Sequence, residues 1–536
     1  MKKILCGVLA AAMVGTALTG CVPQKTNDSS KPASGSTVSA DNFNAEGLPI
    51  LKEKQTFELA AKSRYNKNFA DLQFFQDLEE QTNVHIEWNM SSEDGWDEKK
   101  GLLFAGELPD AFYGQGILTD VDVIKYASQG ILIPLEDMIE QYCPNISKLL
   151  ENEEYRKALT APDGHIYCLP SLTELSPKTH DKLFINKTWL DQLGLPLPTT
   201  LEEFENTLKA FRDNDMNGNG STTDEIPFSF LYNRKENGLF SMFGSFGQLD
   251  NNYNNHFIVQ DDEVVYTPIT EPYKDAIEWF HSLYQQNLID PEGFTHDFSV
   301  YIAKISSPDK TVGAFLGWSL SSAAGNNKAD YVPLAPLKGE DGEQIWNTYP
   351  SAINAKGSFV ITSECENPEA LMRWADLHYV PETSLQIDQG LFGTTLTKEG
   401  DRYTYLPLPE GKTLADMIHE YSPGVNGIGG VTMEIASKLD LNANLQERAD
   451  LDEFYAPYNV PVEEVYPSVF LTNEEVERIS ELETDIVAYI DQTYANWIVN
   501  GGIDAEWDAY LQKLEQMHVQ EYIEIYKAAY ERYQNA

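Results

Sequence analysis

The sequence predicts an α/β protein of two or more lobes with a helical C-terminal region. From residue 56 onward, segments with apolar residues at helical spacing alternate with short strand-like segments. This alternation favours a largely parallel sheet with helices on its faces. The chain has 536 residues, more than one hydrophobic core supports, so we expect it to divide into lobes. Its 42% hydrophobic and 11% aromatic residues provide ample material for packed interiors.

The first 20 residues read as a secretory signal. Lys2 and Lys3 precede an uncharged apolar run from Ile4 to Leu18, which is the usual layout of such a segment. The run of roughly 15 residues is shorter than the about 20 that a membrane-spanning helix needs. It ends in Leu18-Thr19-Gly20-Cys21, which resembles the bacterial lipobox. The resemblance implies that Cys21 is diacylated and becomes the first residue of the mature protein; the alternative is an ordinary signal peptide with an incidental cysteine.

Residues 21–47 are expected to form a flexible tether. They are rich in Ser, Asn, Thr, Gly and Pro and poor in apolar side chains, so burial cannot offset the entropy lost on ordering them. The tether would separate the lipid from the first folded segment.

The charge and the cysteines exclude several classes of protein. The net charge of −46 argues against binding nucleic acid or an anionic membrane surface through bulk electrostatics. Cys143, Cys168 and Cys365 remain beyond the signal and the lipobox. This odd number without short paired spacing argues against a disulfide framework and against a zinc site. A single bridge between Cys143 and Cys168 and two buried free thiols are the alternatives.

The folded part opens with alternating elements. A strand is expected near residues 56–60, a helix over 69–80, a strand over 84–88, a helix near 98–104 and a strand near 108–113. Farther on, Thr200 precedes an acidic first turn, Glu202 and Glu203, and predicts the start of a helix. Residues 273–286 are amphipathic with helical spacing, and Asn287 is a plausible end signal.

Seven stretches in order resemble bacterial extracellular solute-binding proteins of family 1, the substrate-binding lipoproteins of carbohydrate ABC importers. They span nearly all of the mature chain and are FFQDLEEQTNVHIEW with LLFAGELPDAFYG, GILIPLEDMIEQYCPNI, DGHIYCLPSL, LFINKTWLDQLGLPLPTTLEEFENTLKAFRDND, YKDAIEWFHSLYQQNLIDPEGF, ENPEALMRWADLHY and WIVNGGIDAEWDAYLQKLEQMHVQEYIEIYKAAYERY. The resemblance implies a two-lobed periplasmic-binding-protein-like fold of type 2 with a ligand cleft between the lobes.

The resemblance also guides the division into lobes. We expect the first lobe to comprise residues 48–170 with about 335–400, and the second to comprise 171–334 with about 401–536. The chain would cross between them near 165–180, 325–350 and 395–410, where loop-like composition is found.

The function implied by the resemblance is capture of an oligosaccharide or other carbohydrate by hinge closure and its delivery to ABC permease subunits. The protein would be a monomer on the extracellular face of the bacterial cell membrane, held there by its lipid alone. Two other classes stay open: a surface-anchored glycan-active hydrolase or lyase, and a sensor module coupled to a signalling partner. No catalytic residue is assigned, because the sequence holds neither His-Glu-x-x-His nor Gly-x-Ser-x-Gly nor a Walker-type phosphate loop.

One loop has the composition of a calcium site. Oxygen-bearing side chains recur at every second position between glycines, which suits a hard cation; the expected ligands are Asp215, Asn217, Asn219, Ser221, Asp224 and Glu225. Related receptors carry an Asp-x-Asn-x-Asn loop followed by Asp-Glu-Ile-Pro, and residues 224–227 match its end. An EF-hand register beginning at Asp213 competes with this one, and a solvated turn without an ion is the third reading. A bound ion would serve a structural role.

A sugar site needs aromatic rings for stacking and planar polar groups for the hydroxyls. Aromatic or cationic residues next to polar or glycine-rich loops are the candidates: Tyr113, Tyr232, Arg234, Phe243, Phe246, Trp318 and Trp346. Trp318 is the strongest of them, because it follows the apolar run 312–316 and precedes a small-residue loop, where a strand would deliver a side chain into a cleft. Each of these residues also has an alternative as a packed core or surface side chain.

Overall fold

The computed structural model describes residues 42–65, 67–179, 181–232, 237–250, 255–339, 344–348 and 351–535. The expected signal 1–20, Cys21 and most of the expected tether lie outside the described residues, as does Arg234.

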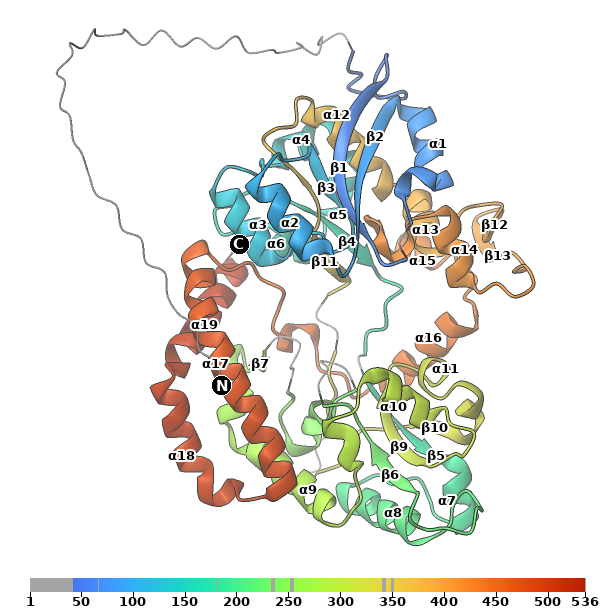
Figure 1. Cartoon of the computed structure of the whole chain (residues 1–536), viewed down its shortest axis with the longest axis vertical. Helices are drawn as coiled ribbons and strands as arrows, with labels where there is room; N and C mark the ends of the chain where they lie inside the picture. The colour runs from blue at the N-terminus through green and yellow to red at the C-terminus, as the bar shows by residue number, and fades with distance from the viewer. Residues whose placement is uncertain are drawn as a thin grey trace, which may run out of the picture. The chain divides into compact units, whose positions relative to one another are not determined.

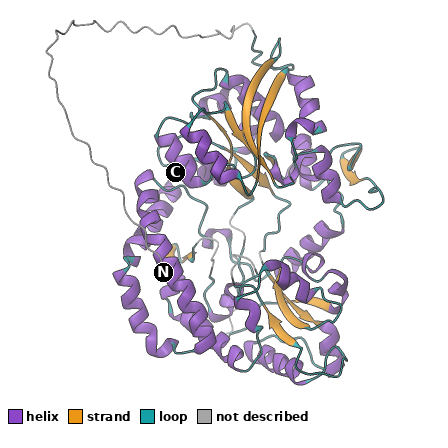
Figure 2. Ribbon diagram, in the orientation of Figure 1, coloured by secondary structure: helices purple, strands orange, loops and turns teal. Residues whose placement is uncertain are grey.

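The first lobe is built on a mixed six-stranded sheet (Figures 1 and 2). Its strands, in spatial order, are β14 (Gly429–Val431), β4 (Leu169–Thr173), β11 (Ile353–Ile361), β3 (Ala111–Tyr113), β1 (Gln55–Ser63) and β2 (Val84–Ser92). β1 pairs in parallel with β2 and β3, as predicted, but β11 is antiparallel to β3 and β4. The sheet is less parallel than expected, because β11 enters it from the second sheet, at the end where β3 and β4 finish.

Short helices cover this sheet. They are α1 (Gln73–Thr82), α2 (Trp96–Ala105), α3 (Asp120–Ser128), α4 (Glu136–Tyr142), α5 (Pro144–Leu149), α6 (Glu153–Leu159), α12 (Pro368–Asp376), α13 (Pro381–Gln389), α14 (Leu414–Tyr421) and α15 (Met433–Ala436). α1, α2 and α12 contact β2, whereas α3 and α6 contact β11. The hairpin of β12 (Leu396–Glu399) and β13 (Arg402–Tyr405) lies beside α14 (Figure 1).

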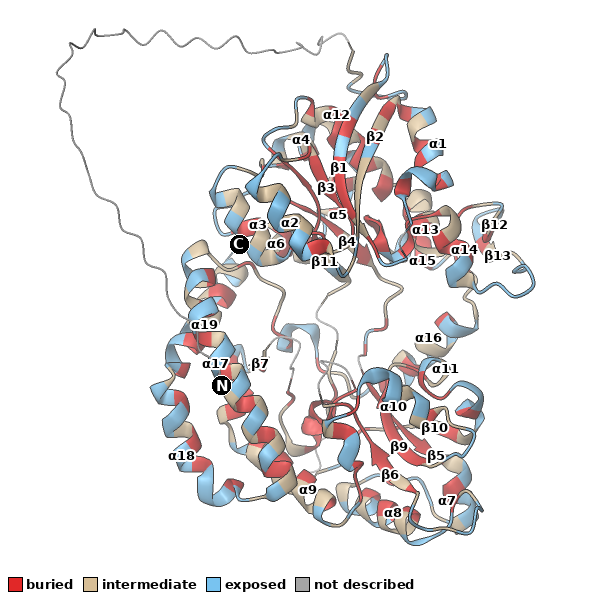
Figure 3. Cartoon of the chain, in the orientation of Figure 1, coloured by how far each residue is buried: buried red, intermediate tan, exposed pale blue. Residues whose placement is uncertain are grey.

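The second lobe holds a four-stranded sheet in the order β10 (Tyr331–Leu334), β5 (Lys182–Asn186), β9 (Val312–Gly317) and β6 (Ile226–Ser229). Its strands are almost wholly buried, as their red colour in Figure 3 shows. The associated helices are α7 (Lys187–Leu193), α8 (Leu201–Asp213), α9 (Glu271–Gln285), α10 (Phe298–Ile305) and α11 (Leu320–Ala323). Thr200 caps α8 by accepting the Glu203 amide at 3.1 Å, as the sequence predicts.

The chain passes between the two sheets at three places that the strand order identifies. The first two, between β4 and β5 and between β10 and β11, overlap the expected ranges 165–180 and 325–350. The third differs from the prediction near residues 395–410, because β14 still pairs with β4 of the first sheet. Residues 429–431 thus lie in the first lobe, and not in the second as their place after residue 401 suggested.

The C-terminal region is helical, as expected, with α16 (Ala443–Tyr455), α17 (Asn473–Asn500), α18 (Ile503–Gln516) and α19 (Val519–Asn535). α17 packs mainly against α9 and α19 and also contacts α3 of the first lobe. Between α16 and α17, Tyr466 is buried in the core of the second lobe and Phe470 in a core of the first. The segment therefore anchors in both lobes.

Two further predictions can be compared with the fold. Residues 42–47, expected in the tether, are bonded to the first lobe: Phe43 packs edge-on to Tyr142 at 5.4 Å, and Arg373 donates to the Gly47 carbonyl at 2.9 Å. The apolar Phe43 side chain gives residues 42–47 a surface to pack against the lobe, which the expected tether composition did not suggest. Cys143 and Cys168 are buried free thiols and Cys365 is half-buried and free, so the bridge between the first two is not formed.

Candidate carbohydrate site and cation loop

Trp318 lies between β9 and α11, where its ring is half-buried beside two cationic side chains. Lys182 Nζ is 5.5 Å from the ring centroid and Arg448 Cζ is 5.7 Å from it. Lys182 is placed there by the sheet, because it pairs with Gly317 at the end of β9. Cations at this distance from an indole ring are attracted to its π-electrons and fix its orientation.

Lys182 is fully buried beside the tryptophan. Its Nζ donates a hydrogen bond to the Thr179 carbonyl at 2.6 Å. Desolvation lowers the pKa of Lys182 to about 8, against the opposing effect of the Asp452 and Asp181 carboxylates. The ammonium group is therefore still charged at neutral pH.

Arg448 is contributed by α16 and is half-buried. Among the described residues, its buried Nε has no hydrogen-bond partner. Desolvation lowers the pKa of Arg448, and the Glu447, Asp388 and Asp452 carboxylates act against this effect. A buried N–H donor without a partner is costly, so this atom is suited to donate to a hydroxyl of a bound molecule.

Asp388, a residue of the first lobe, lies near Arg448. It lies on α13, burial raises the pKa of its carboxyl, and Gln389 Nε2 donates to its Oδ2 at 2.6 Å. Asp388 also lines a small cavity whose other polar members include Gln115, Thr173 and Asn354. Amide, hydroxyl and carboxylate groups of this kind are the hydrogen-bonding partners that sugar hydroxyls require.

Sequence reasoning named Trp318 as a candidate but did not name Lys182, Arg448, Asp388 or Asp452, which the structure places around it or around Arg448. One available signal was the spacing of Asn444, Arg448 and Asp452, because residues four apart share a helix face. Helical spacing places the buried Leu445, Leu451 and Tyr455 around the same side of α16. Asp452 connects α16 to the first crossing, because its carboxylate accepts hydrogen bonds from the backbone amides of Lys178 at 2.8 Å and Thr179 at 3.2 Å.

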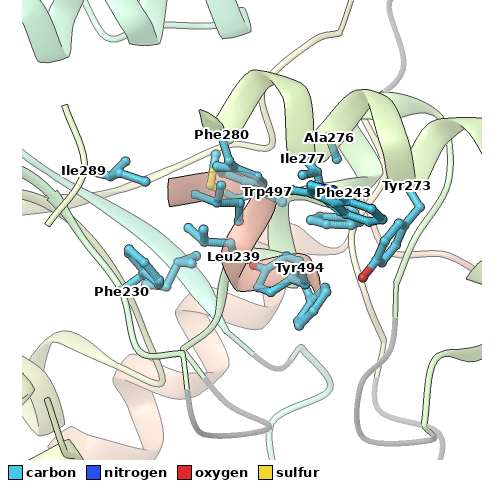
Figure 4. Close-up of a cluster of buried hydrophobic side chains, with 14 of the residues drawn as sticks. Phe230, Leu239, Phe243, Tyr273, Ala276, Ile277, Phe280, Ile289, Tyr494 and Trp497 are labelled. Atoms are coloured by element: carbon cyan, nitrogen blue, oxygen red, sulfur yellow. The ribbon is translucent and has the colours of Figure 1, made fainter. Parts of the chain in front are cut away.

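Three of the predicted aromatic residues are core residues in this structure. Tyr113 is 0% exposed among rings of the first lobe. Phe243 packs against Tyr273 and Phe280 in the second core, as Figure 4 shows. Trp346 is 1% exposed, and its Nε1 donates to the Asp181 carbonyl at 2.6 Å. Residues that are distant in the sequence cover these three rings, so the rings have almost no exposed surface for a ligand.

Tyr232 and Phe246 are half-buried in the second lobe. The Tyr232 hydroxyl donates to the Asp491 carbonyl at 2.6 Å, and its ring stacks on Tyr494. Phe246 packs against Trp279 with ring centroids 5.9 Å apart. Their contribution to ligand binding stays a prediction.

In the predicted cation loop, the backbone folds around the Asp215 carboxylate. Its Oδ1 accepts the amides of Gly218 at 2.8 Å and Asn219 at 3.1 Å, and its Oδ2 accepts the Gly220 amide at 2.8 Å. Gly218 and Gly220 have positive φ values of 76° and 91°, which glycine adopts without strain. The Ser221 hydroxyl lies 3.0 Å from that of Thr223.

The side chains of this loop converge on Asp224. Its Oδ2 accepts Nδ2 of Asn217 at 3.0 Å and of Asn219 at 2.6 Å, and the Asn217 bond lowers the pKa of Asp224. Asp224 Oδ1 and Glu225 Oε2 are buried and have no hydrogen-bond partner among the described residues. Rotating the two asparagine amides by half a turn would exchange N for O and direct their carbonyl oxygens at the same point. The donor set therefore fits a calcium ion.

His, Cys, Asp and Glu alone do not form such a site: within the described ranges no three of them are grouped to hold a metal. The loop relies on asparagine oxygens as well as carboxylates.

Comparison with known proteins assigns the chain to a family. No family model matches it. It is 34% identical over 521 residues to the fructooligosaccharide ABC transporter substrate-binding protein FusA of Streptococcus pneumoniae serotype 4, covering 94% of this chain and 95% of that protein. The chain belongs to the substrate-binding proteins of carbohydrate ABC transporters. Proteins of this family bind a carbohydrate and work with permease subunits, and the close relatives are not enzymes.

Solved structures of relatives agree with the two-lobed fold of this binding protein. The pneumococcal FusA in complex with kestose has a TM-score of 0.78 and 33% identity, over 90% of this chain and 100% of that one. An HMO-binding, ABC-transporter-associated solute-binding protein of Bifidobacterium longum infantis has a TM-score of 0.81 and 28% identity, over 90% of this chain and 99% of that one. Another FusA structure is of an EF-hand mutant in complex with fructo-nystose.

The membership decides between the functions that the sequence left open. It supports the binding protein of an importer over a glycan-active enzyme and over a sensor module. Among the described residues, no helix has both the length and the apolar character needed to cross a bilayer.

Proposed function

We propose that this binding protein captures a neutral oligosaccharide on the ring of Trp318 and delivers it to the permease of an ABC importer. The observation that carries the proposal is the half-buried indole beside the unpartnered Nε of Arg448. The FusA relative, which binds kestose, supports a sugar of several units as the ligand.

The aromatic ring and the polar groups of the proposed site match the apolar faces and the hydroxyls of a sugar. The C–H face of a sugar ring stacks on an indole, while its hydroxyls donate to carboxylates and accept from cationic donors. Arg448 supplies donors, and Asp388 supplies acceptors from the first lobe. Because Trp318 and Asp388 lie in different lobes, a sugar that contacts both would favour the closed arrangement of the hinge.

Isothermal titration of the purified mature protein with kestose and a panel of neutral oligosaccharides tests this site. Trp318→Ala should weaken binding of the tightest ligand at least tenfold, or about 1.4 kcal/mol, because the stacking surface is lost. Arg448→Met should weaken it similarly, because it removes the donor and keeps the aliphatic stem. The matched control is Trp279→Ala, at a half-buried tryptophan that packs on Phe246 and Phe280.

Unchanged affinity in Trp318→Ala, with a folded protein confirmed by its melting curve, would contradict the site. Hydrolysis of any sugar in the panel would contradict the binding-protein function itself.

We also propose that the loop 215–225 holds a structural calcium ion through Asp215, Asn217, Asn219, Asp224 and Glu225, with Ser221 as a further oxygen donor. The unpartnered oxygens of Asp224 and Glu225 support this, and the EF-hand named for the FusA relative is consistent with it. The ion would tie α8 to β6 and take no part in sugar contact.

Thermal melting tests the calcium proposal. Chelation should lower the melting temperature and added calcium should restore it, because an ion that binds only the folded state stabilises it by mass action. Asp215→Asn should melt lower and lose this response, whereas Asp213→Asn, outside the proposed ligand set, should keep it. A wild-type protein that ignores both chelator and calcium would exclude the ion, and loss of the response in Asp213→Asn would favour the EF-hand register.

For location, we propose that Cys21 carries a diacylglyceryl anchor and that the protein lies on the extracellular face of the bacterial membrane. The Leu-Thr-Gly-Cys sequence after the apolar run supports this. In a bacterial host, Cys21→Ser should move the protein from the membrane fraction to the medium, and Cys6→Ser should not. Membrane retention of the Cys21→Ser protein would disprove the anchor.

A further inference from the structure

A cavity of about 420 Å³ lies beside the proposed sugar site, where β13, the start of α14 and the start of α16 meet. This volume is within the roughly 300–1,000 Å³ range of small-molecule sites. Its lining is formed by Tyr405, Leu406, Leu408, Thr413, Leu414, Asn442, Ala443 and Asn444.

Hydrogen bonds connect this cavity to Asp388. The Tyr405 hydroxyl donates to Gln389 Oε1 at 2.5 Å, and Gln389 Nε2 donates to Asp388 Oδ2 at 2.6 Å. The Asp388 carboxylate in turn is near enough to Arg448 to oppose the lowering of its pKa by desolvation. The cavity and the Trp318 site are therefore joined through two adjacent residues of α13.

α16 provides a second, independent connection. Asn444 lines the cavity, and Arg448 lies beside Trp318. The two are four residues apart on one helix, so their side chains share a face with Cβ atoms about 6 Å apart. A molecule that contacts Arg448 and extends toward the N-terminus of α16 would meet Asn444 next.

The chemistry of the cavity is that of a neutral sugar unit. Its lining combines an aromatic ring and leucine side chains with two amides and a hydroxyl, and contains no charged side chain. Asn442 Oδ1 accepts the amides of Asn444 and Leu445 as the helix cap, both at 3.0 Å, and its side chain also bonds to that of Tyr405. Leu408 is 42% exposed, an apolar surface that a sugar face would cover.

We propose that this cavity is a distal subsite, which holds the far end of an oligosaccharide whose near end stacks on Trp318. The inference rests on the proposed function and extends it: the protein selects chain length, and prefers sugars long enough to reach from Trp318 past Asn444 to Leu408. A chain too short to pass Asn444 leaves the subsite unused, whereas a longer chain fills both.

Titration of two probes tests the subsite, namely kestose and a purified linear fructo-oligosaccharide of longer chain. Wild type should bind the longer sugar about tenfold more tightly, equivalent to ~1.4 kcal/mol. Leu408→Asp should remove most of this preference and leave the kestose affinity unchanged. Leu197→Asp is the matched control, because Leu197 is also exposed, at 40%, but lies outside the cavity lining; it should change neither affinity.

The outcomes separate the subsite from the function on which it rests. Equal wild-type affinities for the two probes, or a length preference that survives in Leu408→Asp, would overturn the subsite while kestose binding stands. Loss of both affinities in a folded Leu408→Asp protein would also overturn it, since the residue would then act on the near site. If wild type binds neither probe, the fructan form of the proposed function fails and the subsite fails with it.

Discussion

Trp318 and Trp346 show how the neighbours of a residue decide its role. Both follow sequences that fit a ligand site, yet Trp346 is packed against Tyr455 with its Nε1 bonded to a backbone carbonyl. Trp318 instead meets two cations and keeps part of its ring accessible. The indole is the same in both, and the difference comes from residues more than 100 positions away in the sequence.

His378 makes stability depend on pH. It is fully buried among Phe74, Tyr113 and Trp374, where desolvation lowers its pKa to about 3. Between pH 6.5 and 3 the unfolded chain binds a proton at this position and the folded chain does not, so stability falls as the pH falls through this window. His378→Leu should reduce the slope of the unfolding free energy between pH 6.5 and 4, measured by urea titration.

His518→Asn is the control for this slope, because His518 is exposed and Asn tolerates its positive φ. An identical slope in wild type and His378→Leu would show that the imidazole becomes charged without cost in the folded state.

At the scale of elements, the connection between α16 and α17 links the lobes. Phe470 is 5% exposed in a core of the first lobe, and Lys356 Nζ lies 3.8 Å from its ring centroid while also pairing with Asp120 at 2.5 Å. α17 then begins with a capping box at Thr472 and Glu475 and extends along α9 of the second lobe. The C-terminal helices are thus attached to both sheets.

Phe470→Ala should destabilise the protein by about 3 kcal/mol. The substitution leaves a cavity and removes the aromatic ring with which the buried Lys356 ammonium group interacts. The measurement is the midpoint of urea unfolding, with Phe454→Ala as the control because Phe454 is 39% exposed. A loss under 1 kcal/mol at Phe470 would mean that the connection is not an anchor.

At the scale of the whole molecule, the proposed site draws on both lobes. Trp318 and Lys182 belong to the second sheet, Asp388 to the first lobe, and Arg448 to the helix that follows the third crossing. The Asp452 bonds to residues 178 and 179 tie this helix to the first crossing. A ligand held by these groups would therefore act directly on the connections about which the lobes move.

Small-angle X-ray scattering should show a smaller radius of gyration when the tightest oligosaccharide of the panel is added to wild type. Trp318→Ala should show no change at the same sugar concentration, and the forward scattering should correspond to a monomer. An unchanged radius at saturating sugar would contradict capture by hinge closure.

The sequence alone determined the class of fold and the ordered family pattern, because apolar periodicity and helix caps are local. It predicted the helix at Thr200, the strand before Trp318 and the oxygen-rich loop at 215–225, each readable within about a dozen residues. It could not place Arg448 beside Trp318 or Asp388 near Arg448, separate Trp318 from Trp346 or Tyr113, or find the third crossing. Those depend on strand pairing and burial between distant segments, and so only the tertiary structure decided which aromatic rings are core and which stay partly exposed.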